Sequence, residues 1–413
     1  MTARRIVLQA PRYWPLSGGC ATSTRLVAEG LQASGHAVTV VTARYLRQGP
    51  SRFTLHCVPV MTLDRPGSSG WALLRYLLAW GRWLRSHRQT FDVLHLSGAR
   101  YEAYLALGLL SADVHVWIRA EGTAQRGDRS WWQTHPWGHR VLKRCLAFAQ
   151  SNRSTHPRGQ ARMTIIAESD VQRSEFLGAG FPEESVCVIA PGVPLAEPRT
   201  EARIRAARRL LADIHYTFHV PCTAPVGLFV GPLSRHQQLP ILLDAWCRVV
   251  RQHPEARLWI IGNGPHYRHL WDQVRDRNLD AHVSMPGTFE EPSPLYYAAD
   301  FLIRPSSEPD IPWSVLEAMA HGMPVVLVDN PVHRHVVPSS WHRFLARDGS
   351  AEAIAEAVVH LLGQPGQWSV MGEEGRRRIA TQFCWQNMTQ QYATLLRSCG
   401  RSDSTTAQPS DTF

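Results

Sequence analysis

The chain has 413 residues and a formal net charge of +10, a length that corresponds to about two or three domains. Lys143 is the single lysine, so arginine, whose planar guanidinium suits phosphate and carboxylate groups, carries nearly all of the positive charge. Apolar runs stay short of the ~18 residues that a membrane span needs, and the N-terminus leads into a strand rather than a signal peptide. The eight cysteines show no C-x-x-C pair and no metal-ligand spacing. We therefore expect reduced thiols, no metal site and a cytoplasmic location.

Strand-like and helix-like segments alternate along the first half, which is typical of a parallel sheet covered by helices. The expected elements are strand 5–9, a loop at 15–19, helix 21–33, strand 37–42, helix 71–88, and strands 91–96, 114–119, 164–167 and 186–189. Pro191 and Pro194 break this pattern, and an arginine-rich helix over residues 200–212 leads to the second half. The first half therefore reads as one α/β domain.

The alternation starts again at residue 226. The expected elements are strand 226–230, helix 239–252, strand 257–261, helix 266–277, strands 282–285, 300–304 and 324–328, and helices 351–362 and 367–398 with a break near residue 383. We expect a first domain over residues 1–195, a linker region over 196–224, a second domain over 225–382, a last helix over 383–399 and a disordered tail over 400–413.

The predicted fold class is α/β, with two Rossmann-like, doubly wound domains that face each other. Ligands of such domains bind at the carboxyl ends of the strands, here in the crevice between the domains. No Ser-His-Asp set and no P-loop is present in the sequence. The chemistry is therefore expected from the loops that follow the strands.

Glycine loops follow a strand in both halves. Gly18 and Gly19 precede a helix, so the backbone can approach a ligand and the helix N-terminus can face an anion. Gly264, in the sequence Gly-Asn-Gly-Pro, also opens a helix and places amides near a base or a phosphate. An ordinary tight turn is the alternative for each loop, and local sequence alone favours it. Arg235 and His236 follow the first strand of the second half, either as cationic partners of a phosphate or as solvated loop charges.

Residues 305–326 join acidic residues, a helix start and a buried strand. Pro309 and Pro312 end any earlier regular structure, and Ser314 can cap or open a helix that ends near residue 321. A helix start offers unpaired N–H groups to an anion. Glu317, one turn inside, is expected to bond a specific group such as a ribose hydroxyl, unless it is simply a buried and satisfied glutamate.

Two regions combine tryptophan with basic residues. Helix 71–88 mixes apolar residues and arginines, which suits either an anionic membrane surface or a packing helix whose arginines reach back to solvent. Residues 131–144, in a segment expected to be irregular, border an acceptor site, a lipid face or the core. Peripheral contact with the inner face of a membrane is therefore one of the expectations.

Several motifs share one order and spacing with a known family. They are the Gly18-Gly19 loop, segments 35–42, 91–96, 165–169 and 186–193 in the first half, and segments 231–234, 258–265, 296–300 and 305–326 in the second. In this order they resemble the retaining glycosyltransferases of family 4, which have the GT-B fold. The resemblance extends from Arg5 to about Leu396.

The resemblance implies a nucleotide-sugar donor held mainly by the second domain and an acceptor held by the first. It also implies transfer with retention of configuration, no required metal or other cofactor, and a last helix that crosses back to the first domain. By position, the amides of Gly19, Ser314 and Val315 would meet the diphosphate, Glu317 would bond the ribose, and Glu308 would be the carboxylate near the donor sugar. The basic and apolar surface favours a polysaccharide or lipid-linked glycan as acceptor.

The sequence departs from the family at its cations. Where the family commonly has arginine and lysine that bind diphosphate, this chain has Pro232 and Gln237. In an active enzyme, Arg235, together with His236 or Arg304, would have to supply the missing charge.

The acidic positions depart as well. The family has seven residues between its two glutamates, whereas eight separate Glu308 from Glu317. Either the loop bulges by one residue or Asp310 takes over the role. The family's frequent His-Gly pair is Glu121-Gly122 here, so Glu121 would stand in the place of an active-site histidine.

Two functions from different classes fit these observations. The first is an active, divergent glycosyltransferase, and the second is a catalytically silent GT-B protein that binds a partner or a glycan. A nucleic-acid-binding protein is the third reading, but no known nucleic-acid module is visible and positive charge alone is a weak signal. We therefore expect no nucleic acid partner.

Overall fold

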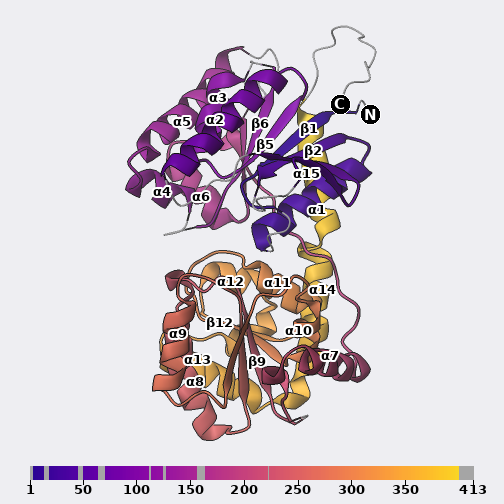
Figure 1. Cartoon of the computed structure of the whole chain (residues 1–413), viewed down its shortest axis with the longest axis vertical. Coiled ribbons are helices and arrows are strands. Elements are labelled where there is room, and N and C mark those ends of the chain that lie inside the picture. Colours follow the sequence, from indigo (N-terminus) through magenta and orange to yellow (C-terminus); the bar gives the residue numbers. More distant parts are fainter. Residues whose placement is uncertain are drawn as a thin grey trace.

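Two β-sheets, each built from its own stretch of chain, form the centres of two lobes stacked along the long axis (Figure 1). The structure is a computed structural model that describes residues 3–13, 18–44, 50–63, 70–110, 113–123, 127–155, 163–221 and 223–399. The loop expected at 15–19 lies partly outside these residues, and the tail expected at 400–413 lies wholly outside them.

The first sheet has eight strands in the order β3-β4-β2-β1-β5-β6-β7-β8. Its strands are β1 (Arg5–Ala10), β2 (Ala37–Ala43), β3 (Arg52–Leu55), β4 (Val58–Leu63), β5 (Val93–Ser97), β6 (His115–Arg119), β7 (Met163–Ala167) and β8 (Val186–Val188). All neighbours pair in parallel except β3 and β4, which form an antiparallel hairpin that the sequence pattern did not predict. The hairpin turns through His56 and Cys57, both with positive φ, and these residue types seldom signal such a turn.

Helices cover both faces of the first sheet. They are α1 (Gly19–Ala33), α2 (Gly70–His87), α3 (Tyr101–Leu109), α4 (Asp128–Thr134), α5 (Gly138–Thr155) and α6 (Asp170–Gly178). Ile6 and Leu8 point to the face covered by α1 and by the last helix, α15 (Trp385–Ser398), whereas Val7 points to the face covered by α2 to α6. This period of two along β1 divides the core of the lobe into two layers.

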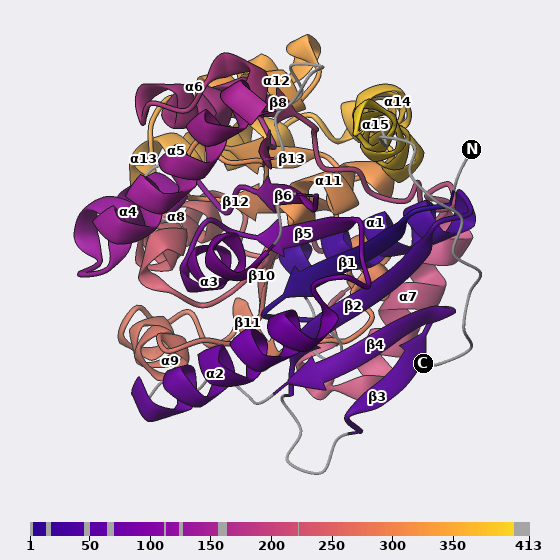
Figure 2. The same cartoon turned by 90° about the horizontal axis from the view of Figure 1, so that it is seen from above.

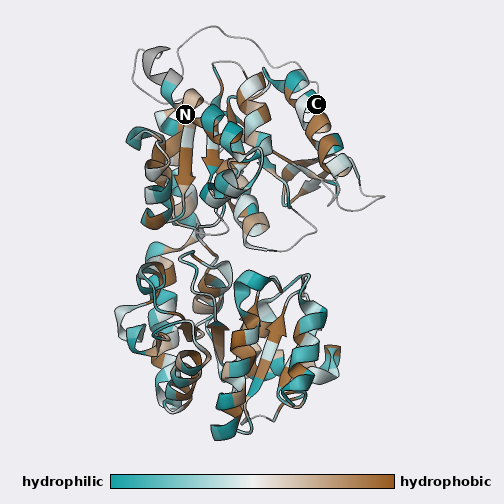
Figure 3. Ribbon diagram, turned by 90° about the vertical axis from the view of Figure 1, so that its left-hand side faces the viewer, coloured by the Kyte–Doolittle hydropathy of each residue, from teal (hydrophilic) through white to brown (hydrophobic). Residues whose placement is uncertain are grey.

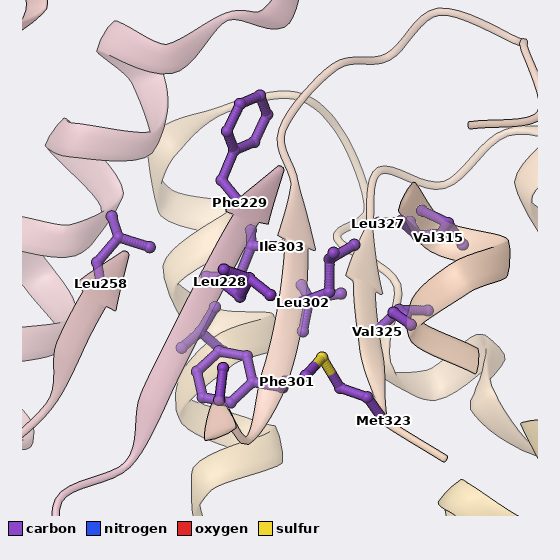
Figure 4. Close-up of a cluster of buried hydrophobic side chains, with 14 of the residues drawn as sticks. Leu228, Phe229, Leu258, Phe301, Leu302, Ile303, Val315, Met323, Val325 and Leu327 are labelled. Atoms are coloured by element: carbon purple, nitrogen blue, oxygen red, sulfur yellow. The ribbon is translucent and has the colours of Figure 1, made fainter. Parts of the chain in front are cut away.

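The second sheet has five parallel strands in the order β11-β10-β9-β12-β13. Its strands are β9 (Val226–Val230), β10 (Arg257–Ile261), β11 (Val283–Gly287), β12 (Phe301–Arg304) and β13 (Val325–Leu327). The helices of this half are α7 (Glu201–Ile214), α8 (Leu239–Gln252), α9 (Tyr267–Asp276), α10 (Ser293–Ala298), α11 (Trp313–Ala320), α12 (Pro331–Val336), α13 (Ala351–Leu362) and α14 (Trp368–Gln382). The central strands are mostly apolar, as the colouring of Figure 3 indicates, and their side chains pack with Val315 of α11 in the cluster of Figure 4. Burial on both faces explains the continuous apolar runs.

Most expected elements are confirmed with small shifts at their ends, and the break near residue 383 separates α14 from α15. Two expectations are wrong. Ser314 does not cap α11, because the helix already begins at Trp313 after Pro312. Residues 131–144 are not irregular, since they form parts of α4 and α5. Gly138 makes the tight turn between those helices possible, because a Cβ there would lie 2.3 Å from the Trp132 carbonyl oxygen.

The chain crosses between the lobes at two places that touch. Val193 pairs with Cys384 in an isolated parallel bridge, with the Val193 N–H donating to Phe383 O at 2.8 Å and the Trp385 N–H donating to Val193 O at 3.2 Å. Beyond this bridge α15 packs on α1, where a Cβ on Gly30 would lie 2.0 Å from Thr389 Cγ2. The C-terminal helix therefore belongs to the packing of the first sheet (Figures 1 and 2).

Gly30→Ala is expected to destabilise the protein even though alanine favours a helix. The propensity gain is at most about 1 kcal/mol, and separating α1 from α15 costs about 1–3 kcal/mol. Gly81→Ala in α2 is the matched control, because its Cβ would meet only Leu109 Cδ1 at 3.9 Å. Urea unfolding should give a lower midpoint for Gly30→Ala and an unchanged or higher one for Gly81→Ala. Equal midpoints for the two variants would contradict this packing.

Candidate functional site

The N-termini of α1 and α11 meet between the lobes. Gly18 is the residue before α1, with φ 142°, and Gly19 is the first residue of the helix. A Cβ on Gly19 would lie 2.4 Å from Cδ1 of Trp313, the first residue of α11. Trp313 in turn packs against the core of the second lobe and against the α1 layer of the first. Glycine is therefore required at position 19 for this approach, and the two positive helix ends lie close together.

Backbone N–H groups at both helix starts precede the first intrahelical bond. In α1 that bond runs from the Thr22 N–H to Gly18 O at 3.0 Å, so the Gly19 amide comes before it. In α11 it runs from the Val315 N–H to Pro312 O at 3.1 Å. The Val315 amide is therefore already engaged and its side chain is buried in the core (Figure 4), whereas the amide of Ser314 precedes the bonded part of the helix.

Glu317 lies one turn inside α11, as expected from the sequence. The Tyr296 hydroxyl, on α10, donates to Glu317 Oε2 at 2.7 Å. Burial raises the pKa of Glu317 to about 7, and this hydrogen bond offsets only part of the effect. At neutral pH the carboxyl group therefore sits near its titration midpoint, with a second oxygen available to a further donor.

The loop after β12 contains the extra residue noted in the sequence. The Asp310 N–H donates to Glu308 O at 2.9 Å, so Pro309 stands at the tip of a three-residue turn. The Asp310 side chain pairs with Arg304, Oδ1 to Nη2 at 2.6 Å, whereas Glu308 Oε1 lies 3.5 Å from His236 Nδ1. The turn separates the two carboxylates, and each has a different partner.

A buried basic residue lies beneath the start of α1. Arg119, the last residue of β6, is 4% exposed, and its Nη2 donates to Cys20 Sγ at 2.9 Å. The Cys20 thiol lies 3.6 Å from Glu121 Oε1. Glu121 also pairs with Arg100, Oε2 to Nη2 at 3.5 Å. Glu121 thus lies at the carboxyl end of the first sheet, next to the glycine loop.

Two further carboxyl groups of this network titrate near neutral pH. Burial raises the pKa of Glu168 to about 7; Arg119 lowers it in part, and Asp310 from the second lobe raises it further. Burial likewise raises the pKa of Asp128 to about 6, against the nearby Arg100. The effect of Asp310 on Glu168 means that a charge of the second lobe lies within electrostatic range of a buried carboxyl group of the first.

The remaining predicted donor residues lie in the loops after β9 and β10. Arg235 and His236 are both exposed on a short 3₁₀ turn. The Gly264 N–H donates to Asn263 Oδ1 at 2.7 Å, and a Cβ at Gly264 would lie 2.3 Å from Leu233 O, so this glycine fits the two loops together. Gln237 is 2% exposed, and its Oε1 has no hydrogen-bond partner among the described residues.

Sequence reasoning missed Arg119, Cys20, Glu168 and Tyr296. Arg119 and Glu168 follow apolar strand residues directly, and this position at a strand's carboxyl end was the one available signal. Their convergence depends on strand order, which a single sequence does not reveal. Across the part of the chain that the structure describes, no group of three or more His, Cys, Asp and Glu residues could hold a metal ion. Within that part, no helix combines the length and the apolar character needed to cross a membrane.

Comparison with known families gives a match in each lobe. Residues 18–192 match the family described as "Glycosyl transferase 4-like domain", and residues 224–364 match "Glycosyl transferases group 1". The two matches together include every strand of both sheets except β1.

Individual proteins are similar at low identity. The lipopolysaccharide core biosynthesis glycosyltransferase LpsE of Rhizobium meliloti is 23% identical over 202 residues, which cover 49% of this chain and 58% of LpsE. A GDP-mannose-dependent alpha-(1-6)-phosphatidylinositol monomannoside mannosyltransferase of Mycobacterium tuberculosis is 25% identical over 269 residues, covering 63% of this chain and 68% of that protein. The chain thus spans little more than half of the first of these relatives.

Solved structures share the architecture. The Anabaena protein Alr3699/HepE, crystallised in complex with UDP-glucose, superposes with a TM-score of 0.72 at 17% identity, covering 96% of this chain and 100% of that one. At this identity the likeness shows the fold, which is the two-domain GT-B arrangement. On the two family matches and this fold, the chain belongs to the glycosyltransferases of family 4 type.

Proposed function

We propose that the protein transfers a sugar from a nucleoside-diphosphate sugar to a glycan or lipid-linked glycan, with retention of configuration. The observation that carries the proposal is the approach of Gly19 to Trp313, which brings the N-termini of α1 and α11 together between the lobes. A departing diphosphate gains negative charge in the transition state, and fixed amides in a dry crevice stabilise it without reorganising. In this proposal the second lobe holds the donor, the first holds the acceptor, and no metal is required.

The nucleotide is assigned to Glu317 and the start of α11. A ribose hydroxyl donates to the carboxylate oxygen that Tyr296 leaves free, and the Ser314 amide meets the diphosphate. Tyr296 fixes the orientation of Glu317, because its hydroxyl bonds one oxygen at 2.7 Å. A preoriented buried carboxylate discriminates strongly against a ligand that lacks the matching hydroxyl.

Glu308 is assigned to the donor sugar. The turn at Pro309 supports this choice over Asp310, because it takes up the additional residue while Asp310 is bound to Arg304 at 2.6 Å. Glu121, at the carboxyl end of β6 in the first lobe, is assigned to the opposite side of the sugar, toward the acceptor. The two glutamates then stand on either side of the reacting centre.

The positive charge missing at Pro232 and Gln237 is assigned to Arg119. Arg304 is already paired with Asp310, and the side chain of Arg235 is exposed on its 3₁₀ turn. Arg119 lies directly beneath the start of α1, where Cys20 separates it from the helix amides by a single side chain. In a buried site its field adds to that of the helix N-terminus.

The first test is a thermal-shift screen with nucleotides and nucleotide sugars, followed by transfer assays. A ligand at 100 times its dissociation constant adds about 2.7 kcal/mol of stability, so the true donor should stand out from its analogues. Hydrolysis or transfer of that donor, with the anomeric configuration retained by NMR, is the expected result. Binding without any turnover would favour the catalytically silent protein, and neither binding nor turnover would overturn the proposal.

Donor affinity is expected to rise as pH increases through about 7. Burial raises the pKa of Glu317 to about 7, and the ionised carboxylate is the better acceptor for a ribose hydroxyl. Glu317→Gln should bind the donor more weakly and lose this part of the pH dependence, measured by calorimetry from pH 5.5 to 8.5. Because a raised carboxyl pKa makes the folded state less stable as pH rises from the unfolded value toward 7, the variant should also lose less stability over that range. A pH profile unchanged by Glu317→Gln would contradict the assignment.

Arg119→Met is expected to weaken nucleoside diphosphate binding about tenfold or more, since one lost charge interaction is worth roughly 1.5–3 kcal/mol. Binding of the bare nucleoside should not change, because it has no phosphate. Arg119→Lys should restore part of the diphosphate affinity. Arg235→Met is the matched control and should have little effect. Equal losses for nucleoside and diphosphate would show that Arg119 only supports the fold.

A further inference from the structure

Helix α2 exposes apolar side chains to solvent on one face. Trp71, Leu74 and Leu78 are 79%, 46% and 49% exposed, and their spacing of three and four residues places them along one stripe. The opposite face of the helix is buried through Tyr76 and Trp80. The exposed stripe is therefore additional to what the core requires.

Arginines flank this stripe, and the neighbouring helices extend the positive surface. Contacts join α2 to α3, α3 to α5 and α4 to α5, which places these four helices in one outer layer of the first lobe (Figures 1 and 2). Its exposed basic side chains are Arg75, Arg82, Arg85, Arg129, Arg140 and Lys143. The acidic residues of these helices are Glu102 and Asp128, and both are buried. This α2–α5 face, defined by those six basic residues and the apolar stripe, shows no exposed carboxylate among the side chains described on the four helices.

An aromatic cluster lies on the same face. Trp137 is 44% exposed and meets Tyr104 edge to face, with ring centroids 6.5 Å apart. The guanidinium of Arg140 lies 4.7 Å from the Trp137 ring, and that of Arg144 lies 4.3 Å from the Tyr104 ring. Tryptophan and tyrosine beside cations are well suited to the boundary between headgroups and acyl chains.

We propose that the α2–α5 face docks on an anionic lipid bilayer. The positive charge of this face is complementary to anionic lipid headgroups. The tryptophan and leucine stripe would insert below the headgroups, into the acyl-chain region of the bilayer. A nucleic acid would match the arginines but would leave Trp71, Leu74 and Leu78 without an apolar environment. The role of docking, which is to bring the protein to a lipid-linked acceptor, rests on the proposed function. Docking itself requires neither a donor nor sugar transfer.

The experiment is cosedimentation of the full chain with phosphatidylcholine vesicles and with vesicles in which phosphatidylglycerol replaces half of that lipid. The protein should bind the anionic vesicles far more strongly, and added salt should weaken the binding. Replacing Arg75, Arg82 and Arg85 together by glutamine should reduce the partition coefficient roughly a hundredfold, since each arginine near the surface contributes about fivefold. Trp71→Ser with Leu74→Ser and Leu78→Ser should remove the binding that persists at high salt.

Helix α7 supplies the matched control, because Leu210 and Ile214 are 49% and 56% exposed there next to Arg209. Arg209→Gln with Leu210→Ser and Ile214→Ser should leave vesicle binding unchanged. Every variant should keep its thermal unfolding midpoint and the shift of that midpoint on nucleotide binding. A loss of vesicle binding would then not result from a loss of folding or of donor binding. The proposal would be overturned if the protein bound neutral and anionic vesicles equally, or if the α7 control lost as much binding as the α2 variants. It would also be overturned if the protein bound duplex DNA more tightly than vesicles and the apolar substitutions did not change that binding.

Discussion

The close contact between Gly19 and Trp313 is the constraint on which the site depends. Trp313 is partly buried and packs against the cores of both lobes, and a Cβ at position 19 would lie 2.4 Å from its ring. Because each residue begins a helix, one contact fixes where two positive helix ends lie. A side chain at position 19 would push the lobes apart and separate the amides that a diphosphate would bridge. The lack of a side chain at Gly19 therefore determines both how closely the lobes approach and where the two helix N-termini lie.

The crossing at Val193 and Cys384 complements that contact. A Cβ on Gly192 would lie 2.5 Å from Cys384 O, so the two crossing segments lie against each other and are joined by backbone hydrogen bonds. The two segments therefore form a single bonded connection between the lobes. Helix α15 then anchors the second crossing on α1, through Thr389 packed on Gly30. The helix that begins at Gly19 is thus packed against α15.

The sequence predicted the alternation of strands and helices well, because the strands are buried on both faces and read as apolar runs. It failed where local signals were missing or misleading. His56 and Cys57 form a hairpin turn with positive φ, a conformation that Asn or Gly usually adopts. The tryptophans near residue 131 obscured helix α4 and the start of helix α5. Glu317 could be located because a glutamate one turn inside a helix is a local feature. Arg119 could not, because only the strand order brings the end of β6 beneath α1.

The proposed move of positive charge from the second lobe to Arg119 has a consequence for how transfer would be controlled. If the family's arginine and lysine positions hold Pro232 and Gln237, the donor's own lobe contributes mainly helix amides, while Arg304 is neutralised by Asp310. The charge that stabilises the leaving diphosphate would then come from the opposite lobe, at the place where Gly19 lies against Trp313. With the lobes apart, the protein would bind the nucleotide, but Arg119 and the α1 amides would lie too far from the diphosphate to activate the bond between it and the sugar. Water could then reach the donor without its hydrolysis being accelerated. Closure would both exclude water and complete the field, and transfer would be favoured over hydrolysis by the same movement.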